Sequence, residues 1–268
     1  MAELLGRSLD GTAISSETYG DGRPLVIVSG ALFAGERWLP TVQLLAPERK
    51  PYVVDRRGRG KSGNTLPYAP EREVEDLLAV LAGIEGPVDL LGHSSGAILA
   101  LQTAARAPAN LERLVVYEPP VFFNDADRIA PDLPERLDAL LAAGQGAAAV
   151  ETFLLEGPRI PEADVRGMQA SSFWPQLVAA FGHTVPYDSR VHRSFPGDAA
   201  ELANIKIPTL MLIGGASPER MVTGARTIAA RLPHAEIVEL PGQQHMAQMT
   251  SAPLFAASVN HFLASRGR

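Results

Sequence analysis

Apolar residues gather in short runs that turn residues separate, and these runs alternate with longer segments of helical periodicity. The runs contain little polar alternation, which is typical of strands buried on both faces of a parallel sheet. Strands are predicted at residues 25–29, 51–55, 88–91, 114–117, 209–213 and 236–240. Amphipathic helices are predicted at residues 72–81, 95–107, 220–232 and 253–265. This order indicates an α/β fold, a mostly parallel sheet with helices on both faces.

Two parts of the chain depart from this alternation. The residues before Pro24 predict an opening antiparallel hairpin, with turn residues at 19–22. The middle of the chain predicts helices without strands, at residues 133–143, 147–155, 162–168 and 174–181. We therefore expect a core of residues 1–118 and 206–268, into which residues 119–205 are inserted as a helical cap, or lid.

Composition narrows the classes of function. The 268 residues carry 24 Lys and Arg against 30 Asp and Glu, a formal net charge of −6, so no nucleic-acid partner is expected. The absence of cysteine excludes thiol nucleophiles, thiolate metal sites and disulfides. No apolar run reaches the roughly 20 residues of a membrane span and no secretory leader is evident, so we expect a cytoplasmic protein. The oligomeric state stays open, with a homodimer as one alternative.

The most informative stretch is Gly92-His93-Ser94-Ser95-Gly96, which lies between a predicted strand and a predicted helix. This pattern in this context is typical of a nucleophile elbow, a sharp turn that exposes the serine hydroxyl. Ser94 is therefore the predicted nucleophile, and the alternative is a serine that only caps a helix. The amide of Ser95, at the start of the helix, is expected to stabilise a developing oxyanion.

A serine hydroxyl needs a base to become a good nucleophile. His245 is the predicted base, because it lies in the Pro-Gly-Gln-Gln-His loop after the last predicted strand. The order along the chain, nucleophile first and histidine last, agrees with a strand-to-helix elbow of this kind. Weaker candidates are His93 within the elbow, His183 and His192 in the insertion, and His234 and His261 at the surface.

Residues 58–63 offer an alternative interpretation, a nucleotide-binding site. Their sequence, Gly-Arg-Gly-Lys-Ser-Gly, matches the pattern of a dinucleotide-binding motif. Such a motif must open a helix, whereas Asn-Thr-Leu-Pro follows here. A phosphate loop would need a glycine at position 55, which is Asp55. A nucleotide site is not expected.

The chain resembles an α/β-hydrolase-fold serine hydrolase of esterase type with a helical cap. Four segments carry the resemblance: VIVSGAL, DRRGRGKS at residues 55–62, GHSSG and PGQQH. It implies that residues 55–62 form a structural corner and that two backbone amides form the oxyanion hole. One amide belongs to Ser95 and the other to Ala31, with Leu32 as the alternative because Ser29 stands where the family more often has histidine. The chemistry requires neither a metal nor an organic cofactor.

The third member of the predicted triad departs from the family pattern. Family members usually carry Asp in a Gly-x-x-Asp-Pro loop after the strand at 209–213, and this chain has Ser217 in that place. A carboxylate is still needed to orient the imidazole and to stabilise its cation. We prefer Glu118, at the end of a strand next to the nucleophile strand, where some members of the fold carry their acid. Glu219 and a site without a carboxylate remain alternatives.

These residues predict a hydrolase that cleaves a small to medium hydrophobic ester or thioester through an acyl-enzyme. The expected apolar substrate pocket consists of Leu32, Phe33, Trp38, Trp174 and Met246. Because one fold supports several reactions, two alternatives stay open. One is a cofactor-free lyase or C–C bond hydrolase, and the other is a receptor that binds a small molecule and retains the triad.

Overall fold

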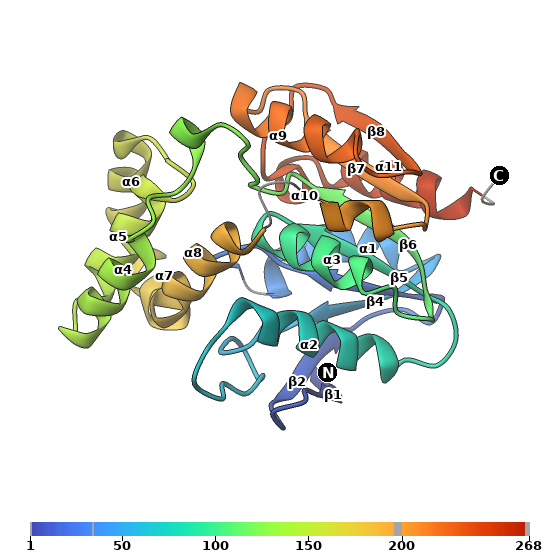
Figure 1. Ribbon diagram of the computed structural model, residues 1–268, viewed down its shortest axis with the longest axis horizontal. Helices are drawn as coiled ribbons and strands as arrows, with labels where there is room; N and C mark the ends of the chain where they lie inside the picture. Colours follow the sequence, from blue (N-terminus) through green and yellow to red (C-terminus); the bar gives the residue numbers. More distant parts are fainter. Residues whose placement is uncertain (1, 34, 196–199, 266–268) are drawn as a thin grey trace.

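The computed structural model describes residues 2–33, 35–195 and 200–265. An eight-stranded sheet runs through its centre in the order β1-β2-β4-β3-β5-β6-β7-β8 (Figure 1). The strands are β1 Ala2–Arg7, β2 Ala13–Thr18, β3 Arg23–Val28, β4 Arg49–Val54, β5 Val88–His93, β6 Leu111–Tyr117, β7 Thr209–Gly214 and β8 Ala235–Leu240. From β4 to β8 neighbouring strands are parallel, and only β2 is antiparallel to both of its neighbours. The predicted fold class, a mostly parallel sheet flanked by helices, is confirmed.

The first two strands form the expected antiparallel hairpin, but the predicted turn is wrong. The hairpin turns at residues 8–12, where the carbonyl of Ser8 accepts from the amide of Gly11. Residues 19–22 instead lead from β2 to β3, and β2 pairs with β4. Both segments contain aspartate and glycine, so turn composition alone does not distinguish them.

Helices cover both faces of the sheet. They are α1 Leu39–Leu45, α2 Pro70–Ala82, α3 Ser95–Ala105, α9 Glu219–Ala229, α10 Ala247–Thr250 and α11 Ala252–Ala264. Side chains of α2, α3 and α9 pack with one face of the sheet in one apolar cluster, and those of α1 and α11 pack with the other face. Within the described ranges, no helix is long and apolar enough to cross a membrane.

A group of helices is inserted between β6 and β7 and extends to one side of the sheet (Figure 1). It comprises α4 Leu133–Ala142, α5 Gly146–Glu156, α6 Glu162–Gln169, α7 Trp174–Phe181 and α8 Val185–Ser194. The insertion has its own apolar cluster, which includes Leu133, Phe153 and Leu177. The first four helices agree with the predicted ranges to within a residue. Helix α8 was not predicted, because the buried positions of its sequence VPYDSRVHRS include Asp188 and Ser189 beside Val185 and Val191, which interrupts the apolar pattern.

Candidate active site

Ser94 lies on a sharp turn between β5 and α3. Its backbone dihedral angles, φ 55° and ψ −126°, are outside the regions that side-chain-bearing residues favour. The turn brings α3 against the end of β3: a Cβ on Gly96 would lie 2.3 Å from the carbonyl oxygen of Val28. Only glycine fits there, which explains the second glycine of the motif. The local geometry is therefore that of a nucleophile elbow.

Strained backbone gathers around this turn. Among the described residues, five other than glycine have positive φ, and three of them are Leu32, Ser94 and Glu118. These three follow β3, β5 and β6, which are adjacent in the sheet. Such conformations cost roughly 1–3 kcal/mol each and cluster at functional sites. The sheet thus directs three strained residues to one edge.

Glu118 and His245 meet at this edge, although 127 positions separate them in the sequence. His245 Nδ1 donates to Glu118 Oε2 over 2.7 Å. The carboxylate is fully buried, whereas the imidazole side chain is 34% exposed. This hydrogen bond leaves Nε2 as the ring nitrogen available to a reacting group. Glu219, the second candidate for the acid, is exposed at the first position of α9.

The environment of Glu118 favours its ionised form. Its second oxygen, Oε1, accepts from the amide of Gly214 over 2.7 Å. Burial raises the pKa of Glu118, but the hydrogen bond and the charge of His245 outweigh it and hold the pKa below its ordinary value. Glu118 is therefore a carboxylate at neutral pH and can stabilise a positive imidazole.

Two residues of the neighbouring strands hold the loop that carries His245. His93 Nε2 donates to the carbonyl of His245 over 2.9 Å, and the Tyr117 hydroxyl bonds to the carbonyl of Gln244. The same hydroxyl accepts from the amide of Ala247 over 3.1 Å. Burial keeps the pKa of His93 well below its ordinary value, so His93 is neutral at neutral pH. Sequence reasoning gave His93 only local packing and did not single out Tyr117.

His93 connects the serine turn to the loop that carries His245. The rings of His93 and His245 are 4.7 Å apart between centroids, and His93 directly precedes Ser94. Among the bonds of the described residues, none joins Ser94 Oγ to His245. Ser94 is 8% exposed.

The loop after β3 touches Ser94. A Cβ on Gly30 would lie 2.7 Å from Ser94 Cβ and 3.2 Å from Ser94 Oγ, so the close approach depends on glycine. The next amide, that of Ala31, and the amide of Ser95 donate to no other residue that the structure describes. The amides of Ala31 and Ser95, the predicted oxyanion donors, are therefore free to donate to a ligand at Ser94.

A buried ionic cluster lies behind these amides. Arg56 donates to both oxygens of Glu73, to Asp188 Oδ1 over 2.8 Å, to Ser95 Oγ over 2.9 Å and to the carbonyl of Ser29 over 3.3 Å. Ser95 Oγ in turn donates to Asp188, which belongs to α8. Sequence reasoning assigned the corner at residues 55–62 no more than a structural role. The sequence of a charged segment does not show which distant carboxylates its arginines will pair with in the fold.

The five residues expected in the substrate pocket separate into two groups. Leu32 and Trp174 belong to the apolar cluster of the insertion, whereas Phe33, Trp38 and Met246 pack with the cluster beneath the sheet. Trp38 is fully buried, and its indole donates to Ser29 Oγ over 2.9 Å. Phe33 lines a cavity of about 330 Å³ together with the corner and α7. A larger cavity, of about 540 Å³, is lined by none of the five.

The site consists of a serine, two histidines, a carboxylate and unused amides. Within the described ranges, no group of three or more His, Asp or Glu side chains is arranged to hold a metal ion. A serine, a histidine and a buried carboxylate at one edge of a parallel sheet form an arrangement suited to acyl transfer.

Comparison with known proteins identifies the family of the chain. The model of the alpha/beta hydrolase family matches residues 25–258. A crystal structure of an alpha/beta hydrolase from Sphaerobacter thermophilus DSM 20745 is 40% identical, with a TM-score of 0.86 over 96% of this chain and 98% of that one. An (E)-2-((N-methylformamido)methylene)succinate hydrolase from Acinetobacter baylyi is 26% identical over 87% of both chains. An N-formylmaleamate deformylase from Pseudomonas putida is 26% identical over 91% of this chain and 90% of its own. The chain belongs to the alpha/beta hydrolase family, and it is a hydrolase.

Proposed function

We propose that the chain hydrolyses a small carboxylic ester or thioester, with Ser94 as nucleophile, His245 as base and Glu118 as acid. The hydrogen bond between His245 and Glu118 carries this proposal. It joins a buried carboxylate to the ring nitrogen that faces away from the reaction, the arrangement that orients a catalytic histidine. Ser94 stands on the adjacent strand end, in the strained turn that exposes a nucleophile.

The proposed reaction has two steps. Ser94 Oγ bonds to the carbonyl carbon while its proton passes to His245 Nε2, and the amides of Ser95 and Ala31 donate to the oxyanion. The bond to the leaving alcohol or thiol then breaks, and the imidazolium returns the proton to it. Water repeats the sequence and releases the acid. The hydroxyl must turn toward Nε2 when substrate binds, since catalytic hydrogen bonds are often long before that point.

The insertion acts as the cap in this proposal. Residues 119–205 contribute α8, whose Asp188 reaches Ser95, and Ser94 beneath has little exposed surface. A cap that excludes water strengthens the electrostatic stabilisation of the oxyanion. Two relatives are named for substrates with a formyl group on nitrogen, so amides are the natural comparison for the ester substrates.

The first test replaces Ser94 by Ala. We expect turnover of p-nitrophenyl esters to fall by about 10⁴-fold or more, because removing the nucleophile removes the acyl-enzyme. The melting temperature should change little, since the elbow is held by Gly96 and the backbone. A fluorophosphonate probe should label the wild type and not the variant, with the adduct located by peptide mass spectrometry.

Kinetics of the purified wild-type enzyme distinguish ester hydrolysis through an acyl-enzyme from other reactions. A burst of p-nitrophenol, equal to the enzyme concentration, identifies an acyl-enzyme, and matched anilides measure the preference for ester over amide. Residual ester turnover above a few per cent in Ser94→Ala would contradict the proposal, as would the absence of labelling in the wild type.

A further inference from the structure

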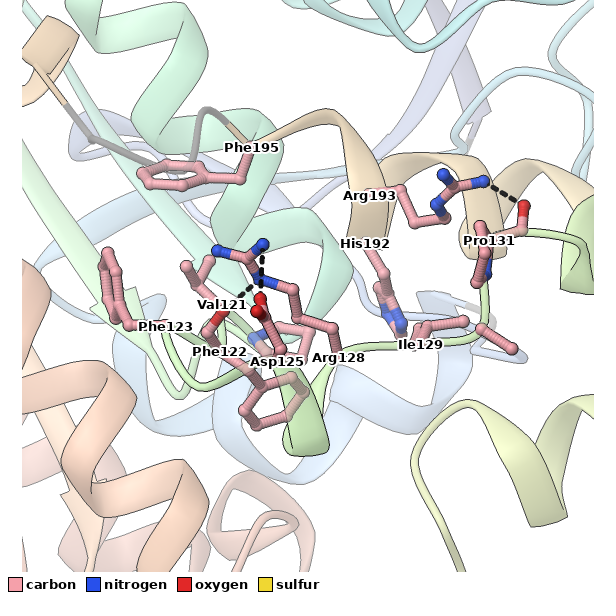
Figure 2. Close-up of a pocket in the computed structure, with 12 residues that line it drawn as sticks. Val121, Phe122, Phe123, Asp125, Arg128, Ile129, Pro131, His192, Arg193 and Phe195 are labelled. Atoms are coloured by element: carbon pink, nitrogen blue, oxygen red, sulfur yellow. Dashed lines mark hydrogen bonds and ion pairs between the residues drawn. The ribbon is translucent and has the colours of Figure 1, made fainter.

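The larger cavity, of about 540 Å³, lies between two segments on the insertion side of the molecule. One wall is formed by residues 120–131, the connection that follows Glu118, and the other by residues 192–195 at the end of α8. Figure 2 shows Phe122, Phe123 and Phe195 on one side of the view, and His192 and Ile129 on the other. The volume suits a small organic molecule.

His192 is the unusual residue of this cavity. Both ring nitrogens are buried, and neither has a hydrogen-bond partner among the described residues. Burial lowers the pKa of His192 to about 4, so the ring is neutral and offers one N–H donor and one acceptor. Buried polar groups in native proteins are almost always paired, and an unpaired one calls for an explanation. A bound ligand that supplies the missing partner would explain it.

The two walls of the cavity continue along the chain to residues that contact the candidate active site, although no residue of that site lines the cavity. His192 lies one helical turn beyond Asp188, the residue that accepts from Ser95 Oγ over 3.1 Å. The opposite wall starts at Pro120, two positions after Glu118.

The charged groups that line the cavity are mainly positive. Arg128 and Arg193 both contribute to its wall, and Arg128 is paired with Asp125 over 2.9 Å. Arg193 donates to the carbonyl of Pro131 and has no carboxylate partner among the described residues (Figure 2). With a neutral His192, the lining carries a net charge of +1. Such a lining attracts an anion and repels a cation.

We propose that this cavity binds a carboxylate group of the substrate, on an apolar chain that leads to the carbonyl attacked by Ser94. Because both ring nitrogens of His192 are buried, the ring must turn toward the cavity on binding. Its N–H then donates to a carboxylate oxygen, and Arg193 compensates the negative charge. The phenylalanine side chains cover the apolar chain. The inference rests on the proposed function, and it specifies the substrates of that site as half-esters of small dicarboxylic acids.

The experiment compares two chromogenic esters, p-nitrophenyl hydrogen glutarate and p-nitrophenyl pentanoate. The measured quantity is the ratio of their kcat/KM values, acid-terminated over neutral, which cancels general damage to the enzyme. We expect the wild-type ratio to be about ten or more, because a charge-assisted hydrogen bond supports at least that discrimination. Arg193→Leu and His192→Leu should each bring the ratio close to one, whereas His192→Gln, which keeps an N–H donor, should retain most of it.

Arg166→Leu is the matched control, since it removes an exposed arginine from α6 of the same insertion, away from the cavity. Its ratio should equal the wild-type value. A wild-type ratio near one, or equal losses in Arg166→Leu and Arg193→Leu, would overturn the inference while the hydrolase stands.

A binding measurement separates failure of the chemistry from failure of the cavity. Saturation-transfer NMR on the Ser94→Ala protein should detect bound monomethyl glutarate. The signal of the bound ligand should disappear in the double variant that also carries His192→Leu. If the wild type turned over neither ester but this difference in binding held, the proposed function would be wrong and the carboxylate site correct. If monomethyl glutarate bound equally to Ser94→Ala and to the double variant, the assignment of His192 would be wrong.

Discussion

Glu118 shows how a carboxylate can be supplied from a different strand. In the loop after β7, Ser217 occupies the position where the family usually carries aspartate, and a hydroxyl cannot balance an imidazolium. Glu118 follows β6, the neighbour of both β5 and β7, and its positive φ of 46° marks a sharp turn at the strand end. The amide of Gly214 at the end of β7 then fixes the carboxylate. The end of β7 therefore holds the proposed acid through a backbone donor.

Replacing Glu118 by Gln tests this residue as the acid. We expect kcat to fall by about 10³–10⁴-fold, because an amide can neither select the imidazole tautomer nor stabilise its positive charge. Glu219→Gln is the matched control, since that side chain is exposed and lies at the start of α9, and it should keep kcat within about twofold. Steady-state kinetics on one chromogenic ester measures both. The opposite ranking would assign the acid to Glu219.

At the scale of elements, one ionic cluster joins the insertion to the core. Asp188 of α8 accepts from Arg56 and from Arg59, each over 2.7–2.8 Å, and all three side chains are buried. Burial raises the pKa of Asp188, yet the two arginines outweigh it and lower the pKa below its ordinary value. Arg56 also bonds to Ser95 and to the carbonyl of Ser29. The position of α8 is thereby linked to both segments that carry the predicted oxyanion amides.

Asp188→Ala should destabilise the protein by about 3–5 kcal/mol, because it removes one of the two carboxylates that neutralise the buried Arg56 and Arg59 and leaves only Glu73. Asp138→Ala is the control: Asp138 pairs with Arg190 of the same α8, but its side chain is half exposed. An exposed pair contributes about 1 kcal/mol or less. Urea denaturation at pH 7.5 measures both changes. Similar losses in the two variants would show that the buried cluster adds nothing beyond an ordinary surface pair.

At the scale of the whole molecule, the sheet and the elbow could be predicted because their signals are local. Continuous apolar runs mark buried parallel strands, and the glycines around Ser94 mark a tight turn. Helix α8 and the cavity could not be predicted in this way. Both depend on contacts between distant segments, such as Arg56 with Asp188, which no periodicity records. The opening turn was misplaced for a related reason, since strand pairing rather than turn composition selects it.

The pH dependence of the stability of the whole molecule can be predicted from two buried histidines. Burial keeps the pKa of His93 well below its ordinary value, and it lowers the pKa of His192 to about 4. In the unfolded chain both would titrate near pH ~6.5. Between the folded and unfolded pKa values the unfolded state binds more protons, so the free energy of unfolding decreases as the pH falls. Above the unfolded pKa this contribution no longer changes.

His192→Gln should therefore flatten the pH dependence of stability. One such histidine contributes a slope of at most about 1.4 kcal/mol per pH unit between pH ~6 and ~4.5. Glutamine does not titrate, so the slope of the variant should be smaller by a large part of that value, and the remainder reports His93 and the carboxylates. His261→Gln removes an exposed histidine and should leave the slope unchanged. Urea denaturation at half-unit pH intervals measures all three proteins. If the wild type and His192→Gln lost stability in parallel as the pH fell, the pKa of His192 would not be lowered in the folded state, and the burial of its ring would be contradicted.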